Sequence, residues 1–353
     1  MKNVLLLFFL VYTADLSGQN LSKISIDNQR QDFEILRKTI EQLHPDPYRY
    51  TNKETFNSKL DSAYNAIQNE LTEIEFYRII APLVTQIKNG HTSISLPDTY
   101  YNGIVLLPLK LVTFQERIYV HRDLLDKKNE IEGFELLQIN NAPVNEIMKK
   151  IIPYVQSDGL NDNARYKAAV EDDLAYYYSQ VFGDSESFEV VLKNQKTQTL
   201  VIKTMQGISN AQFIAHYPHN TSFPWSLQKI DTLNAALLKI GSLDNFVLNN
   251  NKRIFFKNFL KESFNEIKKW KVDNLILDLR NNGGGELKNS IILYSYLVNG
   301  PFQFSKEIEI SSITQPTYIQ YTNYNKAIKH NPIKIKSTVK KRKPFFILTN
   351  IFQ

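Results

Sequence analysis

The sequence predicts an α/β protein built from three successive blocks, and three observations support this fold class. Apolar residues recur at helical spacing from residue 29 to residue 100. From Gly103 the pattern changes to short apolar segments separated by turn residues, which is typical of strands. The last block alternates strand-like and helix-like segments, which indicates a sheet with crossover helices. We therefore expect an N-terminal helical domain, a β-rich module and an α/β core.

The composition of the chain is that of an ordinary globular protein. Its 353 residues are 42% apolar and 22% charged, and the net charge is +6. Much of the positive excess lies in the run Lys334–Lys343, which we interpret as a solvated loop or edge strand because no nucleic-acid motif accompanies it. No nucleic-acid partner is expected. The chain has no cysteine, which excludes disulfides, a thiol nucleophile and thiolate metal sites.

The first residues have the pattern of a secretory signal peptide. Lys2 precedes the apolar segment Val4–Tyr12, and small or polar residues follow from Ala14 onward. This segment has nine residues, whereas a membrane-spanning helix needs about twenty. We predict a signal peptide over residues 1–19, an exported (periplasmic or secreted) protein, and no stable membrane insertion after cleavage. The alternative is a buried first strand or helix.

The helical domain is expected over residues 20–100. Two apolar faces at helical spacing predict its first helices: Phe33, Leu36, Ile40 and Leu43, then Phe56, Leu60, Tyr64 and Ile67. Thr72 and Glu75 form a capping box before a third apolar segment. Pro82 lies inside this segment and should kink or shorten the helix. The block ends at Asn89–Ser93, where a glycine is expected to stop the helix before a short alternating strand.

The β-rich module is expected over residues 101–207. Its predicted strands are Leu107–Val112, Arg117–His121, Phe134–Asn140, Ser187–Lys193 and Thr199–Thr204. The last two strands are expected to pair as a hairpin. Helical segments are predicted at Val144–Ile152 and Asn163–Ser179.

The α/β core is expected over residues 208–353. Its predicted strands are Ala235–Ile240, Leu275–Leu279, 301–310 and Phe345–Leu348. A predicted helix ends at Trp270 and has one apolar face, formed by Phe256, Leu260, Phe264 and Ile267. A second helix is predicted at Glu286–Leu297.

The stretch LILDLRNNGGGEL, Leu275–Leu287, places three glycines directly after a buried strand. A phosphate-binding loop needs a lysine and a hydroxyl residue after its last glycine, whereas Gly285 is followed by Glu286. The spacing of a dinucleotide-binding fingerprint is absent too. Two interpretations remain open at this point: an oxyanion hole made by free backbone N–H groups, or a tight strand-to-helix turn without chemistry.

The segment LDLRNNGGG, Leu277–Gly285, resembles the core motif of the S41 serine peptidases, the tail-specific and tricorn-core family. Other segments resemble this family in the expected order along the chain. They are HPxxY at His44–Tyr48, NGHT at Asn89–Thr92, the glycine strand and helix of a PDZ-like module at Ile131–Ile147, and the opening strand ALLKIGSLDNF at Ala236–Phe246.

The resemblance implies a serine-type peptidase that cleaves a peptide or protein substrate by acyl transfer, without a cofactor or a metal. It implies a ClpP/crotonase-like α/β core, a mixed sheet with crossover helices, and an inserted PDZ-like module at residues 101–207. His91 matches the general base of the family. Backbone N–H groups of Gly284 (first choice) and Gly283 (second) would form half of the oxyanion hole. The loop Tyr101–Ile104 would hold a substrate carboxylate.

The nucleophile is the main departure from the family. In S41 peptidases a serine follows the strand that FFILTN resembles, so the serine would lie within a few residues beyond Gln353. Ser290, Ser311 and Ser312 lack the strand-loop-helix setting of a nucleophile. We therefore expect a truncated peptidase chain that is inactive as given. The alternative is a non-catalytic exported protein that binds peptides or a small hydrophobic ligand. The sequence indicates no oligomeric state.

Overall fold

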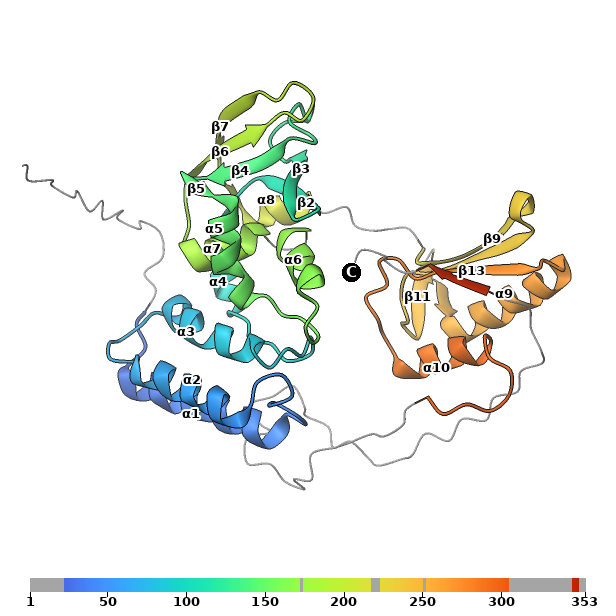
Figure 1. Cartoon of the computed structure of the whole chain (residues 1–353), viewed down its shortest axis with the longest axis horizontal. Coiled ribbons are helices and arrows are strands. Elements are labelled where there is room, and N and C mark those ends of the chain that lie inside the picture. The colour runs from blue at the N-terminus through green and yellow to red at the C-terminus, as the bar shows by residue number, and fades with distance from the viewer. Residues whose placement is uncertain (1–21, 172–173, 217–222, 250–251, 305–344, 349–353) are drawn as a thin grey trace, which may run out of the picture. The chain divides into compact units, whose positions relative to one another are not determined.

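The computed structural model of the chain describes residues 22–171, 174–216, 223–249, 252–304 and 345–348. The chain divides into two compact units, Met1–Tyr217 and Pro218–Gln353, and each is described by itself (Figure 1). The predicted signal peptide, the basic run Lys334–Lys343 and most of the strand predicted at 301–310 lie outside the described residues.

The first unit begins with helices packed around a small apolar cluster. They are α1 (Ile26–Leu43), α2 (Lys53–Asn65) and α3 (Glu73–Thr85), and the short α4 (Asp98–Gly103) follows outside this cluster. Asn52 caps α2, because its Oδ1 accepts a hydrogen bond from the Thr55 N–H at 2.8 Å. Phe33, Phe56 and Leu60 are almost completely buried in one cluster, which confirms the two predicted helix faces.

Helix α3 begins with the predicted capping box. Thr72 Oγ1 accepts a hydrogen bond from the Glu75 N–H at 3.4 Å, and the Glu75 carboxylate accepts one from the Thr72 N–H at 2.8 Å. The bond from the Thr72 backbone lowers the pKa of Glu75. Pro82 lies inside the last turn of the helix, which continues to Thr85.

The strand predicted after the Asn89–Ser93 segment is wrong. Residues 92–97, all described, have irregular structure. The Thr92 carbonyl accepts a hydrogen bond from the Gln156 side chain at 2.8 Å instead of from a neighbouring strand. A hydrogen bond from another loop, instead of one from a neighbouring strand, thus satisfies this backbone carbonyl.

An antiparallel sheet with the strand order β2-β3-β4-β6-β7 forms the centre of the first unit. Its strands are β2 (Leu109–Phe114), β3 (Arg117–Asp123), β4 (Glu135–Ile139), β6 (Ser187–Lys193) and β7 (Leu200–Gln206), and β5 (Ala142–Pro143) pairs with β4. The predicted hairpin is confirmed, because Ser187 pairs with Gln206 and Lys193 with Leu200.

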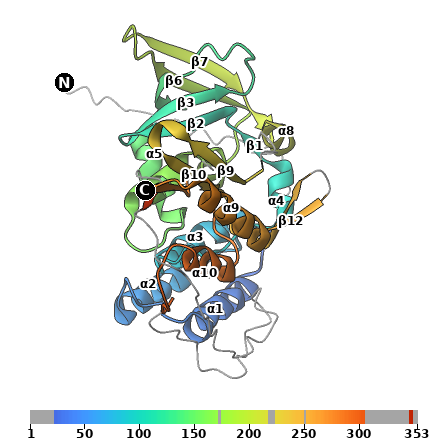
Figure 2. The same ribbon diagram turned by 90° about the vertical axis from the view of Figure 1, so that its right-hand side faces the viewer.

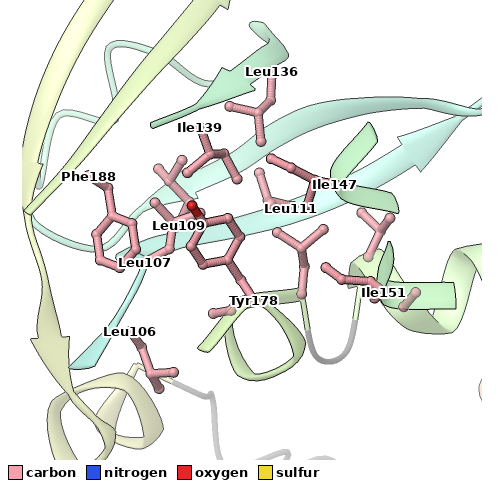
Figure 3. Close-up of a cluster of buried hydrophobic side chains, with 14 of the residues drawn as sticks. Leu106, Leu107, Leu109, Leu111, Leu136, Ile139, Ile147, Ile151, Tyr178 and Phe188 are labelled. Atoms are coloured by element: carbon pink, nitrogen blue, oxygen red, sulfur yellow. The ribbon is translucent and has the colours of Figure 1, made fainter. Parts of the chain in front are cut away.

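Helices pack on this sheet through the main apolar core of the unit. They are α5 (Val144–Ile151), α6 (Asp162–Glu171) and α7 (Leu174–Phe182), with the 3-10 turn η1 (Ile152–Tyr154) after α5. Figure 3 shows Leu111 of β2, Ile139 of β4, Ile147 of α5 and Tyr178 of α7 gathered in one cluster. Tyr77 of α3 belongs to the same cluster, so the helical and β-rich parts share packing within one unit. The domain boundary at residue 100 stays a prediction.

The loop expected at Tyr101–Ile104 is largely the end of helix α4, so the prediction of a loop at this place is wrong. Tyr100 is buried, with its hydroxyl 3.1 Å from Ser179 Oγ, and Ile104 is buried too. This packing favours a helical turn over an open loop. After α4, β1 (Val105–Leu106) pairs with β8 (Ile208–Ser209), which precedes helix α8 (Asn210–Ala215).

The second unit is an α/β sheet with the strand order β14-β13-β10-β9. Its strands are β9 (Trp225–Ile230), β10 (Ala235–Ile240), β13 (Asn274–Asp278) and β14 (Phe345–Leu348), and its helices are α9 (Phe256–Trp270) and α10 (Leu287–Ser295). Strands β10, β13 and β14 are parallel, and β9 is antiparallel to β10. Both helices lie on the same side of the sheet (Figures 1 and 2). Phe256, Leu260 and Phe264 are buried, so the predicted face of α9 is confirmed.

The sequence did not predict β9 or the hairpin of β11 (Phe246–Asn249) and β12 (Lys252–Phe255). These strands carry many exposed residues, among them Leu248 of β11. They therefore lack the alternation of buried apolar and exposed polar residues that predicts a strand. Strand β9 covers the edge of β10, so the parallel strands do not end the sheet on that side.

Candidate active site

Two charged side chains at the carboxyl end of β13 hold each other in place. Asp278 is buried, and its Oδ1 accepts hydrogen bonds from Arg280 N–H at 3.0 Å and Arg280 Nε–H at 2.9 Å. Its Oδ2 accepts a third bond from Arg280 Nη2–H at 2.7 Å. The side-chain hydrogen bonds from Arg280 outweigh burial and lower the pKa of Asp278. The pair therefore fixes the start of the glycine loop.

Asn282 ties the glycine loop to the neighbouring strand. Asn281 takes a left-handed φ of 61°, and the Asn282 N–H donates to the Leu279 carbonyl at 3.2 Å, which turns the chain back. Asn282 Nδ2 donates to the carbonyl of Ile240, the last residue of β10, at 2.8 Å. Its Oδ1 accepts a hydrogen bond from the Gly284 N–H at 2.7 Å. One side-chain amide thus sets both the position and the shape of the loop.

Gly285 is the position where bare backbone is required. Leu243 and Gly285 form a parallel bridge, in which the Leu243 N–H donates to the Gly284 carbonyl at 2.7 Å and the Leu243 carbonyl accepts from the Glu286 N–H at 3.0 Å. The φ of Gly285 is +137°, and a Cβ at this position would lie 2.5 Å from the Leu243 carbonyl carbon. The loop after β10 and the glycine loop therefore approach each other as closely as two strands.

A buried asparagine in the first turn of α10 also stabilises the contact between the Leu243 loop and the glycine loop. Asn289 Nδ2 donates to the Leu243 carbonyl at 2.9 Å and lies 3.3 Å from Asn245 Oδ1. Its side chain is almost completely buried, so these bonds satisfy a group that would otherwise be costly to bury.

The two glycines predicted for the oxyanion hole differ in what their N–H groups do. The Gly284 N–H is already bonded to Asn282 Oδ1. Gly283 is exposed, and its N–H has no hydrogen-bond partner among the residues that the structure describes. In this conformation the Gly283 N–H is thus the one open to a ligand, whereas the Gly284 N–H first has to leave Asn282.

His91 lies in the loop that follows α3, in the first unit, and its side chain is exposed. Its backbone N–H donates to Asn89 Oδ1 at 2.8 Å, and the Thr92 N–H donates to the Asn89 carbonyl at 3.1 Å. The backbone is thus held while the imidazole stays available for proton transfer. The glycine loop belongs to the second unit.

The HPxxY segment closes helix α1. His44 is the C-terminal cap of α1, and its Nδ1 accepts a hydrogen bond from the Asp46 N–H at 3.1 Å. Burial lowers the pKa of His44. The Tyr48 ring packs edge-on against the Phe56 ring of α2, with 5.9 Å between their centroids. These contacts give the segment a packing role.

Among the rejected serines, Ser290 Oγ donates to the Leu287 carbonyl at 2.6 Å, a bond within the first turn of α10. Ser311 and Ser312 lie outside the described residues. In the described ranges no three His, Asp or Glu side chains are grouped so that they could hold a metal ion. The helices of these ranges are also too short or too polar to span a bilayer.

Sequence reasoning did not single out Asn282, Asn289 or the residue that contacts the His91 loop, Asp158. Asn282 had a signal, because an asparagine inside a tight turn commonly bonds to nearby backbone. Asn289 had one too, because it lies on the same helix face as the buried Leu293. Asp158 had none, because its partner Gly90 is 68 residues away along the chain.

Comparison with known protein families finds a match in the second unit. Residues 236–352 match the model of peptidase family S41, and this region contains the glycine loop with strands β10, β13 and β14. This region therefore matches the S41 peptidases, and the resemblance drawn from LDLRNNGGG is confirmed. Among curated protein sequences, none matches the chain.

Two solved CPAF structures share the fold. The crystal structure of a CPAF mutant superposes with a TM-score of 0.55 at 14% identity, covering 78% of this chain and 60% of the CPAF chain. Mature CPAF gives 0.50 at 13% identity, covering 74% and 56%. A photosystem II D1 C-terminal processing protease gives 0.34 at 15% identity, covering 77% and 66%. The chain thus spans less than two thirds of the CPAF chains, and a likeness at this identity concerns the fold.

Proposed function

We propose that the protein is a serine-type peptidase of the tail-specific and tricorn-like kind, which cleaves the peptide bonds of peptides or proteins by acyl transfer. The observation that carries the proposal is the glycine loop at the end of β13. Asn282 and the Leu243 bridge hold its backbone on both sides, while the Gly283 N–H is exposed and has no partner within the described part of the chain. A preorganised, unpaired donor of this kind is what a developing oxyanion requires.

In the proposed reaction a serine Oγ attacks the carbonyl carbon of the scissile peptide bond. His91 takes the serine proton through its imidazole, and the carbonyl oxygen becomes an oxyanion that accepts a hydrogen bond from the Gly283 N–H. His91 then gives the proton to the leaving amine, and water hydrolyses the acyl-enzyme by the same steps. The Gly284 N–H, our first choice from the sequence, would add a second donor once it is released from Asn282.

The nucleophile is proposed to be a serine that follows β14. The resemblance to the family supports a serine a few residues beyond Gln353, and Ser290 is an unsuitable substitute because its Oγ is hydrogen-bonded within α10.

The other parts of the proposal concern substrate and export. The sheet β2-β3-β4-β6-β7, with α5 and α7, would be the PDZ-like module, following the N-terminal helical domain. Strand β7 lies at one edge of this sheet and exposes Leu200 (63%) and Ile202 (68%), which suits the addition of an extended peptide strand. Residues 1–19 would act as a signal peptide, which N-terminal sequencing of the exported protein tests by its new first residue.

The test uses the product of the gene read past codon 353, treated with a fluorophosphonate probe. We expect a single labelled serine shortly after β14, located by mass spectrometry of the labelled peptide. The His91→Ala variant should label at least about 100-fold more slowly, the usual contribution of a general base. His121→Ala, which removes an exposed histidine of β3, is the matched control and should label like the parent.

Two outcomes would contradict the proposal. If His91→Ala labels as fast as the parent, His91 is not the base. If the parent takes up no label, the non-catalytic alternative is favoured, in which the protein binds peptides or a small hydrophobic ligand.

A further inference from the structure

The segment Gln156–Gly159 lies against the loop that carries His91, although the two are far apart in the sequence. Asp158 Oδ1 accepts a hydrogen bond from the Gly90 N–H at 2.6 Å. The Gly159 N–H donates to the Lys88 carbonyl at 2.9 Å, and Gln156 Nε2 donates to the Thr92 carbonyl at 2.8 Å. These three bonds lie on both sides of His91, so the segment holds the loop before and after the histidine.

Gly90 has a specific reason to be glycine in this arrangement. A Cβ at residue 90 would lie 2.9 Å from Asp158 Oδ2 and 3.1 Å from Asp158 Cγ. Its φ is not in the left-handed region, so backbone strain is not the reason. The carboxylate occupies the space of the missing side chain, so a Cβ at residue 90 would make it shift from its position beside the backbone N–H.

The holding segment is itself anchored to the helix that leads into the His91 loop. Thr85, the last residue of α3, donates through Oγ1 to the Pro153 carbonyl at 2.5 Å. The Tyr154 hydroxyl donates to the Arg78 carbonyl, also in α3, at 3.2 Å. Hydrogen bonds therefore link α3 to the turn η1, and the segment after η1 is hydrogen-bonded to the His91 loop that follows α3.

The backbone hydrogen bonds of the His91 loop are consistent with a positioning role for Asp158. Gly90, His91 and Thr92 all have acceptors for their N–H groups, from Asp158 and Asn89. The His91 side chain itself is exposed. A general base has to lie within hydrogen-bond reach of the proton it takes, and a displacement of about 1 Å can cost roughly 100-fold in rate.

We propose that Asp158 is a positioning residue for the proposed peptidase, which fixes the backbone of the His91 loop so that the imidazole meets the serine. This inference rests on the proposed function, since it takes His91 as the base. Asp158 acts through Gly90 and touches neither the substrate nor the reacting atoms.

The first experiment measures the hydrogen bond itself, in the 353-residue chain, by amide hydrogen exchange followed by NMR. Asp158→Ala removes the acceptor, and the exchange of the Gly90 amide should become at least about tenfold faster, as expected when a hydrogen bond to a charged group is lost. Asp158→Asn keeps an oxygen acceptor of the same shape and is the matched control, expected to stay near the parent. Gly90→Ala should resemble Asp158→Ala, because the added Cβ displaces the carboxylate.

The second experiment measures fluorophosphonate labelling of the gene product read past codon 353. Asp158→Ala should lower the maximal labelling rate about tenfold and leave the probe concentration for half-maximal rate unchanged. Asp158→Asn should restore the rate. A purely structural role would not produce this separation together with rescue by the isosteric amide.

The outcomes separate the inference from the function on which it rests. Unchanged exchange of the Gly90 amide in Asp158→Ala overturns the inference, and so does parent-like labelling after that protection is lost. If instead His91→Ala labels like the parent, the proposed function fails, and the catalytic meaning of Asp158 fails with it.

Discussion

Replacing Gly285 with alanine tests whether the glycine loop depends on bare backbone. Two effects add up at this position. An alanine at φ +137° is strained, which costs about 1–3 kcal/mol. Its Cβ, 2.5 Å from the Leu243 carbonyl carbon, must also open the bridge, with the loss of two backbone hydrogen bonds worth about 1 kcal/mol each. We therefore expect Gly285→Ala to lower the free energy of unfolding by roughly 3–5 kcal/mol.

The assay is urea unfolding followed by tryptophan fluorescence. The two tryptophans of the chain, Trp225 and Trp270, both lie in the second unit, so the signal reports on the unit that contains the loop. With a urea dependence of about 2 kcal/mol per molar, the midpoint should fall by roughly 2 M.

The neighbouring glycines are matched controls, because Gly284 has only the left-handed φ and Gly283 has neither effect. A Cβ at Gly284 would contact nothing within 4 Å, but its φ is +100°, so Gly284→Ala should cost only the strain, about 1–2 kcal/mol. Gly283 has neither a close contact nor a left-handed φ, so Gly283→Ala should change stability by less than about 0.5 kcal/mol. If Gly285→Ala is no worse than Gly284→Ala, the reasoning from close approach is refuted.

Two further predictions concern carboxylates. Asp278→Asn should destabilise the second unit by about 1 kcal/mol at pH 7, because the partner Arg280 is more than half exposed and solvent weakens the pair. The pKa of Asp278 is lowered in the folded state. The parent should therefore be more stable than Asp278→Asn above the ordinary pKa of 3.8, and this difference should disappear as the pH falls through the lowered pKa. Equal stability of the two proteins at pH 7 would contradict this. For Asp184, burial raises the pKa, so the parent should gain stability over Asp184→Asn as the pH falls through the raised pKa towards 3.8. Urea unfolding followed by circular dichroism at several pH values measures this, and a difference that does not change with pH would count against it.

Much of the fold followed from periodicity in the sequence. The α9 face, the β6-β7 hairpin and the parallel strands β10 and β13 are buried on one side or both, and burial produces the patterns that sequence reasoning uses. Strand β9 was missed because most of its residues are exposed or partly exposed. The strand expected after Asn89 failed because alternation alone does not supply a partner strand.

The candidate site was predictable only as far as its residues are close in sequence. The glycine loop is a continuous motif, and both its position after a buried strand and its membership of the S41 region are confirmed. The contacts that shape it depend on tertiary structure. Leu243 reaches Gly285 and Asp158 reaches Gly90 across long stretches of chain, and nothing in the local pattern announces either pair.

The Asn282-Gly283 pair also makes the glycine loop a site of possible asparagine deamidation. In an Asn-Gly sequence the glycine nitrogen can close a ring onto the asparagine side chain, which loses ammonia and becomes aspartate or isoaspartate. Here that side chain is bonded at one end to the Ile240 carbonyl and at the other to the Gly284 N–H, and ring closure has to break both bonds. The folded protein should therefore deamidate at this site more slowly than the unfolded chain, as peptide mapping of aged samples would measure. Once formed, a carboxylate could no longer donate to Ile240, so an aged molecule would lose the link between its loop and its sheet.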